Sequence, residues 1–239
     1  MSTSLVHGVA STCPAARVPA PSEVFRKAHF TYFAHNTLQV PRVARQCMVA
    51  LCEGAGALGA ASSIVSYLVR PDPSEPPHPP LRELYGVEHP LHFSCYELPF
   101  LHISSNAGLI ALARLAVYCR HLLRSRATLT RSALTVLSAR NVSVLHVLSS
   151  LRPLFGPSTV VLADVHGLPK ARFGQSAYRR VDGNVCITAH LAQALASRLR
   201  IPSERIRVAH SGVKPSRFSV QLSKADAAKR LGIDRDRKS

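Results

Sequence analysis

The most suggestive single residue is His166, which directly follows the almost continuously apolar run 159–165. Such a run is typical of a strand buried on both faces, as in a parallel sheet. In open α/β sheets, side chains at the carboxyl ends of the strands line the ligand crevice. An imidazole at that place can hydrogen-bond a substrate hydroxyl, stabilise charge or exchange a proton. The alternative, from position alone, is a structural histidine that bonds a loop carbonyl.

Two further polar groups follow shorter β-prone runs. Arg131 comes after 127–130, which we interpret as a short strand, and its guanidinium could bind an anionic acceptor or a phosphate. The alternative for Arg131 is an ion pair at the surface.

Thr188 and His190 straddle the predicted turn from a strand at 185–188 into a helix at 190–199, where backbone amides and a hydroxyl face the crevice. The alternative for Thr188 is a plain helix N-cap.

Two other patterns match known sites only in part. Residues 54–59 read Gly-Ala-Gly-Ala-Leu-Gly, a literal G-x-G-x-x-G, which in dinucleotide-binding domains follows a strand and opens a helix. Here the preceding segment favours a helix. Only twelve residues separate Gly59 from Asp72, too few for a helix and the next strand before an acidic residue that would bind the ribose, so a glycine-rich helix end is favoured.

His89, His92 and Cys95 are spaced like metal ligands but lack a fourth. The sequence therefore predicts no bound cofactor or metal.

The charge balance is strongly basic, with 30 Lys and Arg against 13 Asp and Glu and a net charge of +17. No acid lies between Glu97 and Asp164, whereas seven arginines do: Arg114, Arg120, Arg124, Arg126, Arg131, Arg140 and Arg152. This stretch favours an anionic acceptor or an anionic membrane surface, with a solvated basic face as the alternative. The lack of Trp and of helix-turn-helix or zinc-finger spacing argues against specific nucleic-acid binding.

The ends of the chain differ from its middle. Residues 1–22 are rich in Ser, Thr, Ala and Pro and lack the apolar core of a secretory signal. A disordered leader is favoured there, with organellar targeting as the alternative.

Six scattered cysteines without a C-x-x-C pair favour reduced thiols and a cytoplasmic location, with peripheral membrane contact if the basic stretch binds lipid. No apolar stretch reaches transmembrane length without interruption.

Strands alternate with helices along residues 23–218, which we expect to form one domain. The expected strands are 29–34, 64–69, 127–130, 159–165, 185–188 and 206–209. The expected helices are 41–53, 106–124, 132–150 and 190–199, and the proline-rich segment 71–80 is an expected loop. The alternation predicts an α/β fold, a single Rossmann-like, doubly wound parallel sheet.

The order of short motifs between Val160 and Phe218 resembles the acceptor-side, amino-terminal half of family-4 glycosyltransferases of the GT-B fold. In that half a histidine follows a strand, D-x5-S precedes a helix, and I-P-x-x-(R/K)-I and G-V-D-x3-F come next. Thr130-Arg131 also resembles a Thr-Arg pair at the end of an earlier strand in the family. The matching segments are His166, 182–188, 201–206 and 212–218.

Several positions depart from the family pattern. Thr188 stands where Ser is usual, and Lys214 where Asp is usual. The glycine pair that lets backbone amides approach the donor diphosphate is replaced by residues 36–39, which begin with Asn36. In the family a second domain binds the sugar nucleotide and contains an E-x7-E motif, whereas this sequence stops at Ser239, just past the expected linker.

The resemblance implies the acceptor-binding half of a retaining glycosyltransferase, which would use a nucleotide-sugar donor and would be inactive without a donor domain or partner chain. Residues 219–239 would be a truncated interdomain linker. Two alternatives stay open: a non-catalytic basic module at anionic membrane surfaces, and a dinucleotide-binding protein that uses Gly54–Gly59. The implied site residues are His166 for catalysis, Arg131, Asn36, Thr188 and His190 for substrate binding, and Gly212 as a hinge.

Overall fold

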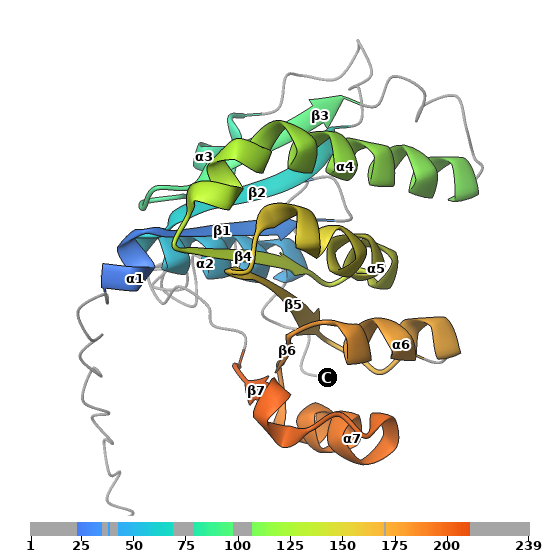
Figure 1. Ribbon diagram of the computed structural model, residues 1–239. Helices are drawn as coiled ribbons and strands as arrows, with labels where there is room; N and C mark the ends of the chain where they lie inside the picture. Colours follow the sequence, from blue (N-terminus) through green and yellow to red (C-terminus); the bar gives the residue numbers. More distant parts are fainter. Residues whose placement is uncertain are drawn as a thin grey trace, which may run out of the picture.

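A single sheet of seven strands forms the centre of the computed structural model, which describes residues 23–34, 38, 43–68, 79–97, 107–169 and 171–210 (Figure 1). The strand order is β3-β2-β1-β4-β5-β6-β7, and every neighbouring pair is parallel. From β1 the chain builds outward to β3, and from β4 it builds outward in the other direction to β7. This is the doubly wound, Rossmann-like arrangement. The predicted fold class is confirmed.

The elements have the following bounds. The strands are β1 (Ala28–Phe33), β2 (Ala61–Leu68), β3 (His92–Glu97), β4 (Leu134–Ala139), β5 (Thr159–Val165), β6 (Gly183–Cys186) and β7 (Ile206–Val208). The α-helices are α1 (Glu23–Arg26), α2 (Val43–Ala57), α3 (Leu81–Leu84), α4 (Ala107–Arg131), α5 (Val142–Leu151), α6 (Arg172–Arg180) and α7 (Ala189–Leu199). Two short 3₁₀ turns lie at Arg152–Phe155 and Ser203–Arg205.

Alternate residues of the strands pack against two layers of helices. Phe33 and Val65 belong to the larger buried cluster, to which α4, α5, α6 and α7 contribute. Tyr32 and Ile64 belong to a smaller cluster with residues of α2 and α3. Figure 1 shows α4 and α5 in front of the sheet and α2 behind it. Because successive strand side chains point to opposite faces, β1 and β2 contribute to both clusters, whereas the buried apolar residues of β5, β6 and β7 belong to the larger one.

The predicted strand at 127–130 is wrong, because α4 continues to Arg131. The Ala-Thr-Leu-Thr run resembles strand alternation, but Leu129 extends a helical stripe in which Tyr118, Leu122 and Leu129 are all buried. The Thr130 hydroxyl donates to the Arg126 carbonyl four residues back, 2.9 Å away, as a threonine can within a helix. Arg131 therefore ends a helix and not a strand.

The predicted helix at 132–150 is wrong in its first half, which forms the central strand β4. Residues 134–139 pair with β1 on one side and with β5 on the other. Asn141 ends this segment and begins α5, because its Oδ1 accepts hydrogen bonds from the amides of Ser143 and Val144 at 3.0 and 3.3 Å. An asparagine at this place is a strong N-cap signal, and it marks a boundary that the sequence analysis treated as a weak point within a helix.

The glycines of residues 54–59 play different parts at the end of α2. Gly54 and Gly56 lie inside the helix, which continues to Ala57, and do not end it as predicted. A β-carbon on Gly56 would overlap the Pro90 carbonyl oxygen, whereas one on Gly54 would meet nothing within 4 Å. Gly59 ends the turn with a φ of 93°, a conformation that favours glycine. These roles concern packing and turning.

These two helical glycines give a matched pair of expected results. Gly54→Ala should raise the free energy of unfolding by about 0.5–1 kcal/mol, because alanine lowers the backbone entropy of the unfolded chain. Gly56→Ala should lower it by about 2 kcal/mol, because the new methyl group forces α2 and the Pro90 loop apart. Urea denaturation of both variants measures the difference. Equal effects of the two substitutions would contradict the close approach of α2 to Pro90.

Besides β4, the elements α1, α3, β3 and α6 were not predicted, whereas the strand at 159–165 and the helix near 190–199 are confirmed. None of the described helices is both long and apolar enough to cross a membrane. Several predictions fall outside the described residues: the leader at 1–22, most of the loop at 71–80, Asn36, Gly212 and the linker at 219–239.

Candidate functional site

The point at which the sheet changes direction lies between β1 and β4, which are neighbours at its centre. In doubly wound sheets a ligand crevice opens at this point, outside the carboxyl ends of the strands. Arg140 directly follows β4, and His166 directly follows the next strand, β5. Both side chains therefore start at the edge of the sheet where a ligand is expected.

Asp164, near the end of β5, joins these groups into one network. The residue is only 9% exposed. Its Oδ2 accepts hydrogen bonds from the Tyr32 hydroxyl at 2.7 Å and from Nη2 and Nε of Arg140 at 2.8 and 3.2 Å. Its Oδ1 lies 2.9 Å from Nε2 of His166. A carboxylate this deeply buried is tolerated because hydroxyl and charged donors surround it.

The ring of His166 is held by two partners that favour opposite tautomers. Its Nε2 lies 2.9 Å from Asp164 Oδ1, which can only accept a hydrogen bond, and 2.5 Å from Nη2 of Arg140, which can only donate one. A proton on Nε2 satisfies Asp164 and leaves Nδ1 as the acceptor of the ring, whereas a proton on Nδ1 leaves Nε2 to accept from Arg140. The two contacts together fix the orientation of the ring at the edge of the sheet.

Burial lowers the pKa of His166 below its ordinary value, and the positive charge of Arg140 lowers it further, while Asp164 acts in the opposite direction. The ring is therefore neutral at pH 7, and one of its two nitrogens is a hydrogen-bond acceptor. Burial and the Asp164 charge raise the pKa of Tyr32 well above its ordinary value. Tyr32 thus remains a hydroxyl donor to Asp164 throughout the physiological range.

Thr188 and His190 start at the same edge of the sheet as His166. The amide of Ile187 donates to the carbonyl of Val165 at 3.3 Å, which joins the ends of β6 and β5. Thr188 is the N-cap of α7, with its hydroxyl accepting from the Leu191 amide at 3.2 Å, and His190 is exposed in the first turn. Thr188 and His190 thus follow the strand next to β5, but among the described residues no contact joins their side chains to the His166 network.

The cap predicts how Thr188 substitutions behave. Thr188→Ala should lower the free energy of unfolding by about 1 kcal/mol, because the Leu191 amide loses its acceptor. Thr188→Asp should keep the stability, since a carboxylate also caps and interacts favourably with the helix dipole. Chemical denaturation of both variants tests this. If Thr188→Ala unfolds at the wild-type denaturant concentration, the capping role is refuted.

Arg131 is not brought together with His166. It ends α4 and lies three residues before β4 begins, so it is at the amino-terminal edge of the sheet. His166 lies at the carboxyl-terminal edge, on the far side of a six- or seven-residue strand. The role predicted for Arg131 depended on its ending a strand, and the structure removes that premise. Asn36 and Gly212 lie outside the described residues.

Sequence analysis missed three members of the network, namely Tyr32, Arg140 and Asp164. One signal for Asp164 was present, because it is the lone charge in an otherwise apolar strand. Such a charge is tolerated only with partners. Its partners could not be read from local spacing, since Tyr32 comes 132 residues earlier and Arg140 comes from another strand.

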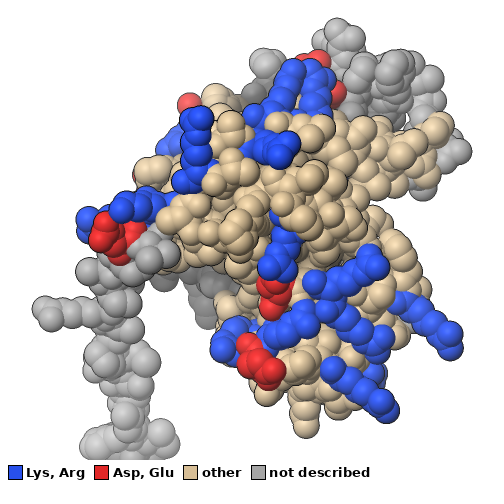
Figure 2. Space-filling model, in the orientation of Figure 1, with Lys and Arg blue, Asp and Glu red and all other residues tan. Residues whose placement is uncertain are grey.

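The acid-free basic stretch is only partly an open positive surface. Arg140 pairs with Asp164, Arg152 pairs with Asp182, and the Arg114 guanidinium lies 4.7 Å from the centre of the Tyr67 ring. Figure 2 shows Lys and Arg side chains gathered over the end of the molecule formed by α6 and α7, with few acids among them. The exposed arginines of these two helices and their ends are Arg172, Arg179, Arg180, Arg198 and Arg200.

The structure does not place the two partial motifs in the settings that their functions need. The G-x-G-x-x-G run forms the end of α2 and leads into β2, whereas in dinucleotide-binding domains it follows a strand and opens a helix. His92 and Cys95 are three residues apart on β3 and therefore point to opposite faces of the sheet. Among the described residues, no group of His, Cys, Asp and Glu has the arrangement of a metal site.

The comparisons with known proteins give matches only at the level of structure. No protein-family model and no curated protein matches the sequence. A glycosyltransferase from Rickettsia africae matches 87% of this chain with a TM-score of 0.53 and 14% identity. HepE from Anabaena, solved in complex with UDP-glucose, matches 85% with a TM-score of 0.52 and 11% identity. This chain covers 50% of each of those chains, so it has the fold of half of these glycosyltransferase structures.

Proposed function

We propose that this chain is the acceptor-binding half of a retaining glycosyltransferase, similar to family 4, that takes its sugar from a nucleotide-sugar donor. The main support is the network of His166, Asp164 and Arg140 at the carboxyl edge of the sheet. The fold match to half of two glycosyltransferases supports the same class. HepE was solved with UDP-glucose, which makes this compound the first donor to test. Retention is expected from the family-4 resemblance.

In this proposal His166 contacts the transferred sugar or the attacking acceptor hydroxyl. The proposal uses the tautomer in which Nε2 donates to Asp164, so that Nδ1 accepts a hydrogen bond from that hydroxyl. Arg140 makes the ring harder to protonate and so keeps the acceptor nitrogen free. Stabilisation of the departing nucleotide diphosphate would come from positive groups on the donor half. Thr188 and His190 would contact the acceptor from the next strand.

The experiment uses the longest reading frame that contains this sequence, which should encode an E-x7-E domain if the proposal holds. The purified product is incubated with UDP-glucose and a panel of acceptors, and UDP release and glucosylated products are measured. Acceptor-dependent UDP release with retained anomeric configuration is the expected result. A folded protein that binds UDP-glucose but glucosylates no acceptor, and binds anionic vesicles instead, would favour a non-catalytic basic module.

A further inference from the structure

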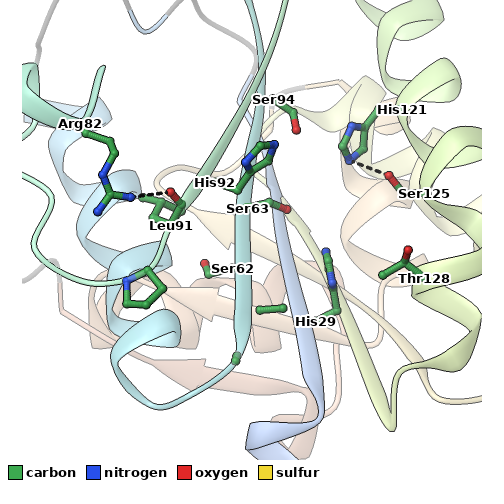
Figure 3. Close-up of a pocket in the computed structure, with 13 residues that line it drawn as sticks. His29, Ser62, Ser63, Arg82, Leu91, His92, Ser94, His121, Ser125 and Thr128 are labelled. Carbon is green, nitrogen blue, oxygen red and sulfur yellow. Dashed lines mark hydrogen bonds between the residues drawn. The ribbon is translucent and has the colours of Figure 1, made fainter. Parts of the chain in front are cut away.

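A hollow of about 550 Å³ lies at the edge of the sheet opposite to His166. It opens between the starts of β1, β2 and β3 and the carboxyl-terminal half of α4 (Figure 3). Histidines and hydroxyl side chains dominate its polar lining, and none of them belongs to the Asp164 network. The principal groups are His29, His92, His121, Ser94, Ser125 and Thr128.

The fold brings these residues together from three elements. His29 and His92 lie near the starts of β1 and β3, and β2 runs between them with His29 paired to Ala61 and His92 paired to Ser63. On α4, His121, Ser125 and Thr128 are spaced by four and three residues, which places them on one face of the helix. Figure 3 shows the imidazoles of His92 and His121 at one end of the hollow and that of His29 below them.

Some of these groups are held in place and others are free. The Nδ1 of His121 lies 2.9 Å from the Tyr96 hydroxyl, and its Nε2 lies 3.4 Å from Ser125 Oγ. His121 is therefore a fixed, buried ring. Within the part of the chain that the structure describes, the side chains of His29, His92 and Ser94 have no hydrogen-bond partner. They are available to a ligand.

The charges around the hollow favour an anion. Its lining includes no Asp or Glu and one fixed cation, Arg82, whose Nη1 donates to the Leu91 carbonyl at 3.0 Å. Arg124 is exposed on α4, three residues from His121 and four from Thr128, and so flanks the same face. Burial and the neighbouring His29 and His92 lower the pKa of His121 to about 4, and burial also lowers the pKa of His29.

We propose that this hollow binds a small tetrahedral oxyanion of the phosphate or sulfate type, either free or as the phosphate group of a larger metabolite. His29 and His92 donate to its oxygens when protonated, and Ser94 and Thr128 donate through their hydroxyls. When the three rings are protonated and the hollow is empty, they repel one another. An anion between them removes that repulsion. This site is independent of the proposed sugar transfer, since it occupies the other edge of the sheet.

Anion binding and proton uptake are therefore linked. The lowered pKa values of His29 and His121 mean that stability is fully present above the ordinary histidine pKa of about 6.5 and is lost as the pH falls below it. A bound anion raises these pKa values and opposes that loss. Its affinity should consequently increase as the pH falls from 7.5 to 5.5. The titratable and charged groups that line the hollow are His29, His92, His121 and Arg82. Arg124 is exposed on the same face of α4 as His121 and Thr128.

The test is calorimetric titration with sulfate, whose charge is constant over this range, at fixed ionic strength in chloride. We expect the affinity to rise by about tenfold or more from pH 7.5 to pH 5.5, because the anion then bonds charged donors. The double variant His29→Gln/His92→Gln should lose about tenfold in affinity at pH 5.5. The control His146→Gln, at a histidine that stacks on Phe173 away from the hollow, should bind as wild type.

A second readout does not depend on the variants folding. In the wild-type protein, saturating sulfate should raise the titration midpoints of the His29 and His121 ring signals in NMR. At fixed pH it should also change the chemical shifts of the His92 ring and leave those of the His146 ring unchanged. Inorganic phosphate and glucose 6-phosphate, compared at one pH, distinguish a free anion from a phosphorylated metabolite. Binding that is equal at both pH values, equal in the double variant, or absent would overturn the proposal.

Discussion

Asp164→Ala should lower the free energy of unfolding by about 3 kcal/mol. The substitution leaves the Arg140 guanidinium, whose side chain is 22% exposed, without its counter-ion. It also leaves the buried Tyr32 hydroxyl without its acceptor. Removing one partner of a buried ion pair costs about 3–5 kcal/mol, and the partial exposure of Arg140 places the effect at the lower end. Urea denaturation measures the loss, which corresponds to a fall of roughly 6–12 °C in Tm for a chain of this size.

A matched control comes from the exposed pair of Lys27 and Glu23, which are four residues apart at 2.8 Å with side chains 65% and 81% exposed. Glu23→Ala should leave the unfolding curve unchanged within error, because exposed pairs contribute little. Asp164→Asn separates charge from shape, since the amide oxygen can still accept one hydrogen bond. An unfolding midpoint for Asp164→Ala equal to that of Glu23→Ala would show that the network is not a stabilising feature.

Much of the second half of the fold could be predicted because its signals are local. The apolar run at 159–165 fits a strand covered on both faces, and β5 has these bounds. The helix near 190–199 has Thr188 as its cap, a signal contained within four residues. The strand at 185–188 was displaced by two residues, since β6 begins at Gly183 and ends at Cys186. A glycine and an asparagine at its start weaken the β-prone pattern.

The boundary between α4 and β4 could not be read locally. Residues 127–139 alternate small, polar and apolar side chains throughout, and this pattern suits either structure. Tertiary packing decides between them: Leu129 packs in the large cluster as part of α4, and Leu137 packs there from the sheet. This boundary also affected the choice of site residues. With β4 at residues 134–139, Arg140, and not Arg131, directly follows a strand at the carboxyl edge of the sheet.

For a related reason, the sequence pointed to His166 but not to the side chains that contact it in the candidate site. His166 follows a strand that its own sequence reveals, and its position relative to the sheet edge was therefore correct. The groups that orient it come from β1, β4 and β5, and they meet only because β4 lies between the other two. Strand order is a long-range property that no motif in this sequence encodes. The hollow at the other edge of the sheet shows the same limit, since His29, His92 and His121 come together only through strand order and the position of α4.

His166→Ala should lower the turnover of the complete enzyme by roughly 10²-fold or more, the scale for losing one well-placed group that acts in the transition state. Its side chain is 25% exposed at the sheet edge and fills little of the core, so the variant should fold. The Michaelis constant for the acceptor should change little, because the contact is expected at the reacting centre. Circular dichroism and steady-state kinetics with UDP-glucose measure these three quantities together.

The pH dependence gives the sharper form of this prediction. Since the pKa of His166 is lowered, the neutral ring persists below pH 6.5, and wild-type turnover should fall only at more acidic pH. Asp164→Asn removes the charge that favours the protonated ring and should move this acidic limb lower still. His146→Ala, at a ring that contacts Phe173 and Ser176 of α6, serves as the control and should leave turnover unchanged. If His166→Ala keeps full turnover, or if it unfolds, the histidine is structural and the network around Asp164 stabilises the fold without taking part in transfer.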